Sequence, residues 1–259
     1  MRNVLILVSI CILMAAQDSK AQSALTIGIR LNPEYTGILN KNDANAGPEL
    51  DYERHFGYCA GVGATYALTN HIGLGVDILF SREGQAFSGH FTGIELNETA
   101  YSTVVARQGF LNDEPVEGDY VALAELNYIK LPLMISLSTD NSKPVFFSML
   151  AGPQINFLQG VAQEVNEKDL EYPNTDISPK DLYKPVTLAG MLALGAGINV
   201  GPRLVLSARL RMDYGFNDAE KKDAMIRYYG AEAVRFYSAD RKSANSFSTG
   251  LMIGFDFKL

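Results

Sequence analysis

The sequence predicts an all-β protein, an eight-stranded antiparallel up-and-down transmembrane β-barrel with long extracellular loops. Apolar residues alternate with small or polar ones along eight segments, each close to the ~9–11 residues that a transmembrane strand needs. The connections between these segments are long and short in strict alternation. The second face of the segments is rich in glycine and poor in charge, which suits the crowded interior of a small barrel better than a soluble surface.

Period-two alternation defines the predicted strands, which span residues 25–31, 58–66, 72–80, 126–137, 145–157, 187–200, 204–216 and 247–259. One parity is rich in leucine, isoleucine and valine, and we expect it to face lipid. The residues assigned to this face are Ile27, Ile29, Val62, Leu74, Val76, Ile129, Leu131, Leu192, Leu194 and Leu206.

The loops fix the orientation of the predicted barrel. Residues 69–71, 138–144 and 201–203 are short and contain residues typical of turns, whereas residues 32–55, 84–123, 159–185 and 217–245 are long. In an up-and-down order, all long loops then lie at one end and both termini at the other. Outer-membrane barrels have this asymmetry, with short periplasmic turns and long external loops.

Paired aromatic residues on the apolar face support a membrane band. Phe147 and Phe157 lie ten residues apart, as do Phe247 and Phe257. Ten residues of tilted strand rise about 25 Å, the height of the lipid-facing band between aromatic girdles.

The first residues predict export. A basic start at Arg2 precedes an apolar run from Val4 to Ala16, and Ser19-Lys20-Ala21 places small residues where signal peptidase cuts. We expect residues 1–21 to be a cleaved signal peptide, with cleavage after Ala16 as the alternative, and residues 22–259 to form the barrel domain.

Composition excludes several function classes. The chain has 22 Lys+Arg against 29 Asp+Glu, a net charge of −7, which disfavours nucleic-acid binding. Three His and two Cys are too few for a His/Cys metal architecture, so we expect neither a metal nor a cofactor. The expected location is the bacterial outer membrane, with its lipids as partners.

Charged residues fall on the face opposite the apolar one. We interpret Arg30, Asp77, Lys130, Arg209 and Asp256 as a structural charge ladder that interacts across the lumen, because charges facing lipid are expensive. The same parity also includes Arg211, Asp213 and Lys258.

The stretch Leu126-Asn127-Tyr128-Ile129-Lys130-Leu131-Pro132-Leu133 resembles the Leu-Asn-Tyr-Leu-Glu-Ile-Pro-Leu signature of small PorT-like outer-membrane β-barrels, with Lys130 replacing the usual Glu. The segments 151–153 and 195–197 match more loosely. The terminal Gly254–Leu259 resembles the strand that the outer-membrane assembly machinery recognises, with Leu in place of the final Phe. The resemblance implies the fold and the compartment, and implies a link to secretion only through its named member.

Candidate catalytic groups are sparse. Ser88 and His90 share a face of an extended segment, but no acidic partner stands at a useful spacing. Cys59 lies among glycines, and we interpret it as a small side chain that fills space in the lumen. We therefore expect no catalytic residues and no enzyme activity.

Residues 217–245 form the best candidate for partner binding. Cations and rings interleave there, and such residues are enriched at interaction hot spots. They are Arg227, Tyr228, Tyr229, Arg235, Phe236 and Tyr237. Asp218 predicts the start of a short helix that runs through Tyr229.

Three function classes follow, in order of preference. The first is a non-enzymatic barrel whose extracellular loops bind another envelope component, with a role in secretion implied only by the PorT-like resemblance. The second is a small-solute pore, and the third is an enzyme that modifies outer-leaflet lipids.

Overall fold

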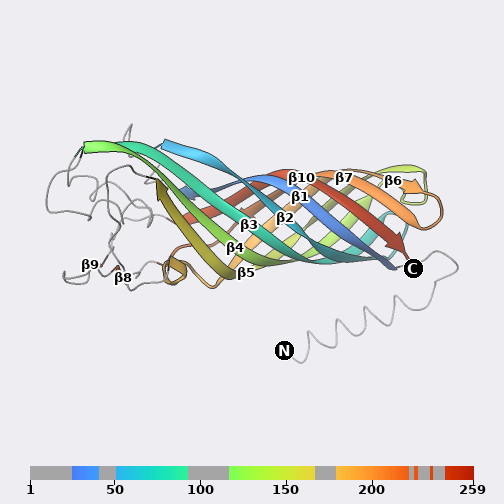
Figure 1. Cartoon of the computed structure of the whole chain (residues 1–259). Coiled ribbons are helices and arrows are strands. Elements are labelled where there is room, and N and C mark those ends of the chain that lie inside the picture. The colour runs from blue at the N-terminus through green and yellow to red at the C-terminus, as the bar shows by residue number, and fades with distance from the viewer. Residues whose placement is uncertain are drawn as a thin grey trace, which may run out of the picture.

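Eight strands close into an antiparallel up-and-down barrel, which confirms the predicted fold (Figure 1). The computed structural model describes residues 25–40, 51–92, 117–166, 179–221, 225–226, 234–235 and 243–259, so the predicted signal peptide lies outside the described residues. The order around the barrel is β1-β10-β7-β6-β5-β4-β3-β2. The strands are β1 (Leu25–Asn40), β2 (Asp51–Ala67), β3 (Ile72–Thr92), β4 (Glu117–Ser138), β5 (Val145–Asn166), β6 (Val186–Val200), β7 (Leu204–Gly215) and β10 (Ala244–Lys258).

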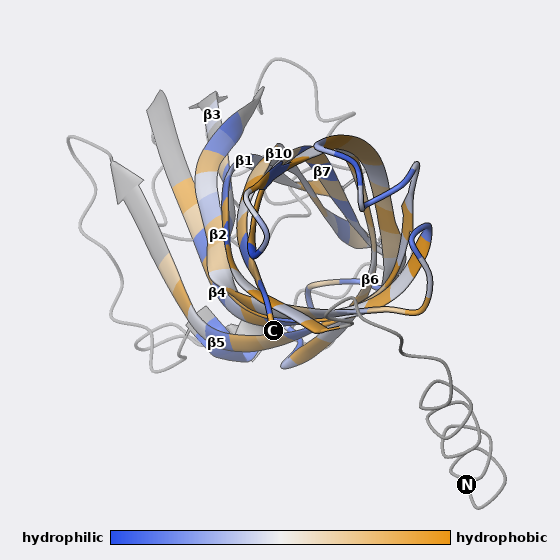
Figure 2. Ribbon diagram, turned by 90° about the vertical axis from the view of Figure 1, so that its right-hand side faces the viewer, coloured by the Kyte–Doolittle hydropathy of each residue, from blue (hydrophilic) through white to orange (hydrophobic). Residues whose placement is uncertain are grey.

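The apolar face of the barrel points outward, as the alternation predicts. Among the residues assigned to lipid, Ile129, Leu131 and Leu206 are half-buried and the others are exposed. Phe147 and Phe257 are also exposed. Viewed along the barrel, the strands form a closed ring in which hydrophobic and hydrophilic segments alternate (Figure 2).

Short turns close the end of the barrel that carries the C-terminus. Gly201 adopts a φ of 70°, a left-handed conformation that glycine reaches without steric cost. At the next turn, the Asp140 carboxylate accepts hydrogen bonds from the Ser142 amide at 3.1 Å and the Ser142 hydroxyl at 2.6 Å. These bonds hold the pKa of the exposed Asp140 carboxyl below its usual value.

Several strands are longer than the alternation suggested, mainly toward the end opposite the short turns. The predicted end of the first strand at Leu31 is wrong, because β1 continues to Asn40. Pro33 does not stop it, since the pairing of β1 with β10 skips Asn32 and Pro33 and then resumes at Glu34. Strand pairing with β2 continues past the proline, so the chain stays extended.

Strands β3, β4 and β5 extend beyond the ring (Figure 1). Pairing of β5 with β6 ends at Phe157 and Val186, whereas its pairing with β4 continues to Val121 and Asn166. Strands β3 and β4 pair as far as Thr92 and Glu117. We call this extension of residues 85–92, 117–125 and 159–166 the outer wall.

Two short elements lie outside the ring. A 3-10 helix, η3 (Pro179–Leu182), precedes β6, and β8 (Met225–Ile226) pairs with β9 (Val234–Arg235). The helix predicted to run from Asp218 through Tyr229 is therefore wrong. The Asp218 carboxylate does accept the Glu220 amide at 3.2 Å, but it also accepts the Ala244 amide at 3.0 Å and so ties this segment to β10.

Within the described residues, none of the helices is long and apolar enough to cross a membrane.

Candidate functional site

The barrel interior holds charged side chains in two separate groups. The first charge cluster consists of Arg30, Asp77 and Asp256, from β1, β3 and β10. Arg30 Nη1 lies 2.5 Å from Asp256 Oδ1, and Arg30 Nε lies 3.8 Å from Asp77 Oδ1. A side chain at Gly63 would overlap the Asp77 carboxylate, so this glycine provides room for the charged group.

Arg209 lies on β7 and bonds to hydroxyl groups. Its Nε donates to Ser148 Oγ at 2.9 Å, and its Nη1 donates to Ser207 Oγ at 2.7 Å. The structure thus brings Arg30, Asp77 and Asp256 of the predicted ladder into direct contact, and it places Arg209 on serines instead of on a carboxylate.

The second charge cluster is centred on Lys130 of β4. Lys130 Nζ lies 2.9 Å from Asp213 Oδ2 and 4.0 Å from Glu34 Oε1, and it also contacts the Glu83 carboxylate. Arg211 Nε donates to Asp213 Oδ1 at 2.9 Å. All five side chains are buried.

Glu34 and Glu83 were not predicted as lumen residues. Both lie just beyond the predicted ends of their strands, yet each continues the parity of the charges already assigned to the lumen: Glu34 follows Arg30 and Glu83 follows Asp77. Extending the alternation past Pro33 and Phe80 would have found them.

Neutral polar side chains extend the second charge cluster toward β5 and β6. Gln154 accepts a hydrogen bond from Arg211 Nη2 at 2.7 Å and donates to Asn156 at 2.8 Å. Asn156 in turn donates to Thr187 at 3.2 Å. The network therefore links β4, β5, β6 and β7 through the interior, which fixes these strands relative to one another.

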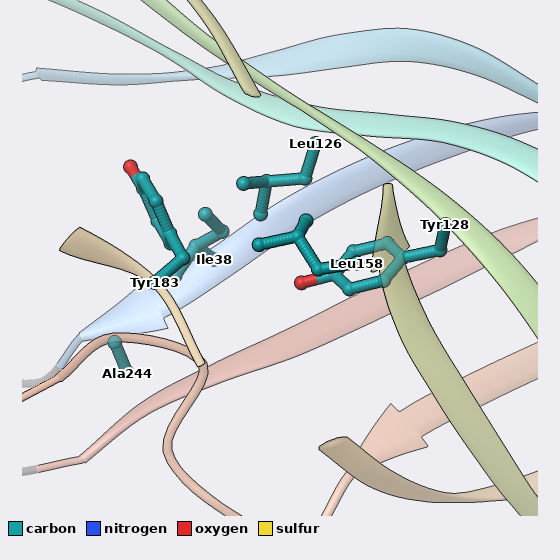
Figure 3. Close-up of a cluster of buried hydrophobic side chains, with 6 residues drawn as sticks. All are labelled: Ile38, Leu126, Tyr128, Leu158, Tyr183 and Ala244. Carbon is teal, nitrogen blue, oxygen red and sulfur yellow. The ribbon is translucent and has the colours of Figure 1, made fainter. Parts of the chain in front are cut away.

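Two apolar clusters also occupy the interior. One contains Met134, Leu150, Met191, Ala193 and Met252. The other, which we call the outer plug, contains Ile38, Leu126, Tyr128, Leu158, Tyr183 and Ala244 (Figure 3). The expectation that the lumen face carries only small or polar side chains is therefore wrong near the outer mouth, where apolar side chains point inward.

A lid of two loop segments covers the outer plug. Tyr183, just after η3, forms an isolated bridge with Glu220. Lys184 donates its amide to the Ala219 carbonyl at 2.8 Å, and Ala219 donates its amide to the Ala244 carbonyl at 2.8 Å. Backbone hydrogen bonds thus hold residues 183–184 and 218–220 to each other and to β10. Tyr183 and Ala219 are almost fully buried.

The histidines lie at opposite ends of the barrel. His71 Nδ1 lies 3.1 Å from the Ser138 carbonyl oxygen in the region of the short turns. His55 Nε2 lies 3.3 Å from Glu125 Oε1, and Arg82 contacts the same carboxylate. Ser88 and His90 lie on β3, and the side chain of His90 is outside the described residues.

No group of three His, Cys, Asp or Glu side chains suited to a metal ion occurs in the described part of the chain. Cys59 is buried in the lumen, on the glycine-rich face of β2.

The predicted partner-binding residues lie mostly outside the described residues. This applies to Arg227, Tyr228, Tyr229, Phe236 and Tyr237. Only the backbone of Arg235 is described, where it pairs with Met225.

The comparison with protein families agrees with this architecture. The family described as outer membrane protein beta-barrel domain matches residues 15–221. No curated protein matches the chain in sequence.

The chain is also similar to solved structures. Neisserial surface protein A has 11% identity and a TM-score of 0.44, with 93% of this chain and 100% of that chain covered. OprG from Pseudomonas aeruginosa has 11% identity and a TM-score of 0.41, with coverage of 92% and 97%. The outer membrane protease OmpT from Escherichia coli has 10% identity and a TM-score of 0.42, with coverage of 95% and 100%.

Proposed function

Because the chain belongs to the outer membrane protein beta-barrel domain family and lies in the bacterial outer membrane, we propose that it is a non-conducting barrel with a binding surface at its extracellular end. The partner is another envelope component. The barrel anchors this surface in the membrane and has no catalytic role of its own.

The filled interior is the observation that carries this proposal. Charged, amide and methionine side chains span the lumen, and the outer plug and its lid cover the outer mouth. An eight-stranded barrel is just wide enough for side chains to fill. A solute would have to separate buried ion pairs in order to pass, which makes the pore the weaker alternative.

Because the interior is filled, the surface for binding a partner lies at the extracellular end. The outer wall extends beyond the ring on one side, and the lid holds residues 218–220 against β10 at the base of the loop that follows them. The interleaved cations and rings of residues 227–237 are the sequence feature that favours binding of a partner there.

The resemblance of Leu126–Leu133 to PorT-like barrels supports a partner in the secretion machinery. In this chain Leu126 and Tyr128 belong to the outer plug, and Lys130 belongs to the second charge cluster. These three residues of the resemblance therefore have structural roles inside the barrel, so we assign partner choice to the loops.

An enzyme that modifies outer-leaflet lipids is the third candidate. His55 and Glu125 form the kind of pair that orients a general base, but Arg82 shares the same carboxylate. We interpret these three side chains as an ion-paired cluster in which the buried Glu125 carboxylate holds His55 and Arg82.

Replacing residues 222–242 by a short Gly/Ser linker tests the proposal. Residues 218–220 are kept because they form the lid, and the Ala219 amide lies 2.8 Å from the Ala244 carbonyl, so a short linker can close the gap. We expect the variant to assemble in the outer membrane and to lose the proteins that co-purify with the intact chain.

A second deletion serves as the matched control. Residues 93–116 connect Thr92 and Glu117, which are paired neighbours, so they can be shortened in the same way. The control should keep the co-purifying proteins. If the 222–242 variant keeps every partner, or if both deletions remove them equally, the assignment to this loop is wrong.

A further inference from the structure

A row of hydrogen-bond donors crosses the outer face of the barrel where its apolar band ends. Tyr58 of β2 is paired with Arg82 of β3, and Arg82 is paired with Asn127 of β4. Tyr58 and Arg82 are exposed and Asn127 is half-buried. We call these three residues the donor row.

The register places the donor row at the level of the lipid headgroups. The next outward-facing row toward the membrane is Ala60, Phe80 and Ile129. The rings of Tyr58 and Phe80 lie 6.2 Å apart, and those of Tyr35 and Phe56 lie 5.6 Å apart on the neighbouring strands. Aromatic side chains of this kind mark the boundary between hydrocarbon and headgroups.

Arg82 is held in place on this surface. Its Nη2 bonds to Glu125 Oε2, and the Glu125 carboxylate also lies beside His55. The Glu125 side chain is only 8% exposed, whereas the Arg82 side chain is 45% exposed. Because a guanidinium carries five N–H donors, it can bond to Glu125 and to an external anion together.

The strand beyond Asn127 leaves room for a headgroup. Asn127 is paired with Gly160 of β5, which has no side chain. Among the described residues, the nearest neighbour of a Cβ atom at Gly160 would be the Asn127 side-chain amide, 3.8 Å away. No other described side chain therefore crowds the surface beside the donor row at Gly160.

We propose that the donor row binds the phosphate of a phosphorylated lipid in the outer leaflet. Arginine matches phosphate geometry with paired N–H groups, and the Tyr58 hydroxyl and the Asn127 amide add neutral donors. The acyl chains of the lipid lie over Phe80 and Ile129, directly below. A lipid fits better than a soluble anion because donors and apolar residues are adjacent on one face.

Native mass spectrometry of the intact protein in detergent, titrated with phosphorylated lipid A, tests this site. Arg82→Gln removes the charge and should weaken binding about tenfold, since a hydrogen bond to a charged group contributes on that scale. Arg203→Gln is the matched control, because Arg203 is an exposed arginine in the turn at the opposite end. It should bind as the unchanged protein does.

Two further arms identify the ligand and guard against misfolding. Dephosphorylated lipid A should bind equally weakly to the unchanged protein, Arg82→Gln and Arg203→Gln. Inorganic phosphate should not displace the phosphorylated lipid at equal concentration. Asn127→Leu leaves the Arg82–Glu125 contact intact and should still weaken binding by about threefold.

Three results would overturn the proposal: equal binding by the Arg82→Gln, Asn127→Leu and unchanged proteins, binding that does not depend on the lipid phosphate, or displacement by inorganic phosphate.

Discussion

Lys130 and Asp213 meet across the inside of the barrel, with Lys130 Nζ 2.9 Å from Asp213 Oδ2, although the two residues are 83 positions apart in the chain. Lys130 lies on β4 and Asp213 on β7, two strands that are not neighbours in the ring. The contact therefore links two non-adjacent strands through the interior, in addition to the hydrogen bonds between adjacent strands.

Lys130→Met should lower the free energy of unfolding by about 3–5 kcal/mol, because the buried Glu83 carboxylate loses its contact with Lys130, and Asp213 keeps only Arg211 of its two cations. Unfolding by denaturant in lipid vesicles measures the change. Adding Asp213→Asn to the variant should recover part of the loss, which a double-mutant cycle detects.

Lys258→Met is the control for this prediction. Lys258 is only partly buried near the end of β10, where its Nζ donates to Asn199 Oδ1 at 2.8 Å. Its replacement should cost no more than about 1 kcal/mol. Equal costs at Lys130 and Lys258 would show that the contact across the lumen contributes nothing.

Much of the fold was predictable because one rule governs each strand. Lipid on one side and a packed lumen on the other impose period two, so the alternation correctly placed Ile27 and Val62 outside and Arg30 and Asp77 inside. Residues typical of turns predicted which connections are short, and the positions of the short connections predicted the orientation of the barrel.

The contacts inside the barrel were not predictable in the same way. Parity shows that Arg30 and Lys130 point inward, but the stagger between strands decides which carboxylate each one meets. The tether from Asp218 to Ala244 depends on two segments that meet only when the barrel closes. A local helix-capping pattern could not distinguish this tether from a helix start.

Val62→Arg should destabilise the barrel by about 2–4 kcal/mol, the cost of an arginine facing mid-bilayer lipid. Val62 lies midway between Tyr58 and Tyr66 on β2, and it is paired with Ile29 and Ile78, which are also exposed. Equilibrium unfolding in lipid vesicles gives the value.

Ile129→Arg provides a depth comparison within the same measurement. Ile129 is paired with Phe80 and Phe157 near the outer edge of the apolar band, so the cost there should fall to about 0–1 kcal/mol. If Ile129→Arg proves more costly than Val62→Arg, the position of the band on the barrel is wrong.

Cys59 should resist a charged methanethiosulfonate reagent while the barrel is folded, because its side chain is buried in the lumen. In a Cys11→Ser background, we expect labelling at least about a hundredfold slower than at Ser142→Cys on an exposed turn. Mass spectrometry over time measures both rates. Equally fast labelling would mean that water and solutes reach the lumen.

Asp218→Ala should loosen the lid without unfolding the barrel. The substitution removes the acceptor for the Glu220 and Ala244 amides, which costs about 1–3 kcal/mol for groups buried there. Hydrogen exchange at the Glu220 and Ala244 amides should therefore become faster. Ser243→Ala, which changes the exposed residue next to Ala244, is the control, and its exchange rates at the same two amides should match those of the unchanged protein. Unchanged protection in Asp218→Ala would show that the lid does not depend on this carboxylate.

Planar-bilayer recording of the purified, intact protein tests the closed barrel most directly. The buried ion pairs, the methionine cluster and the outer plug predict no steady open channel at any moderate voltage. A stable ohmic conductance from the pure protein would contradict the closed lumen and would make a small-solute pore the better account of its function.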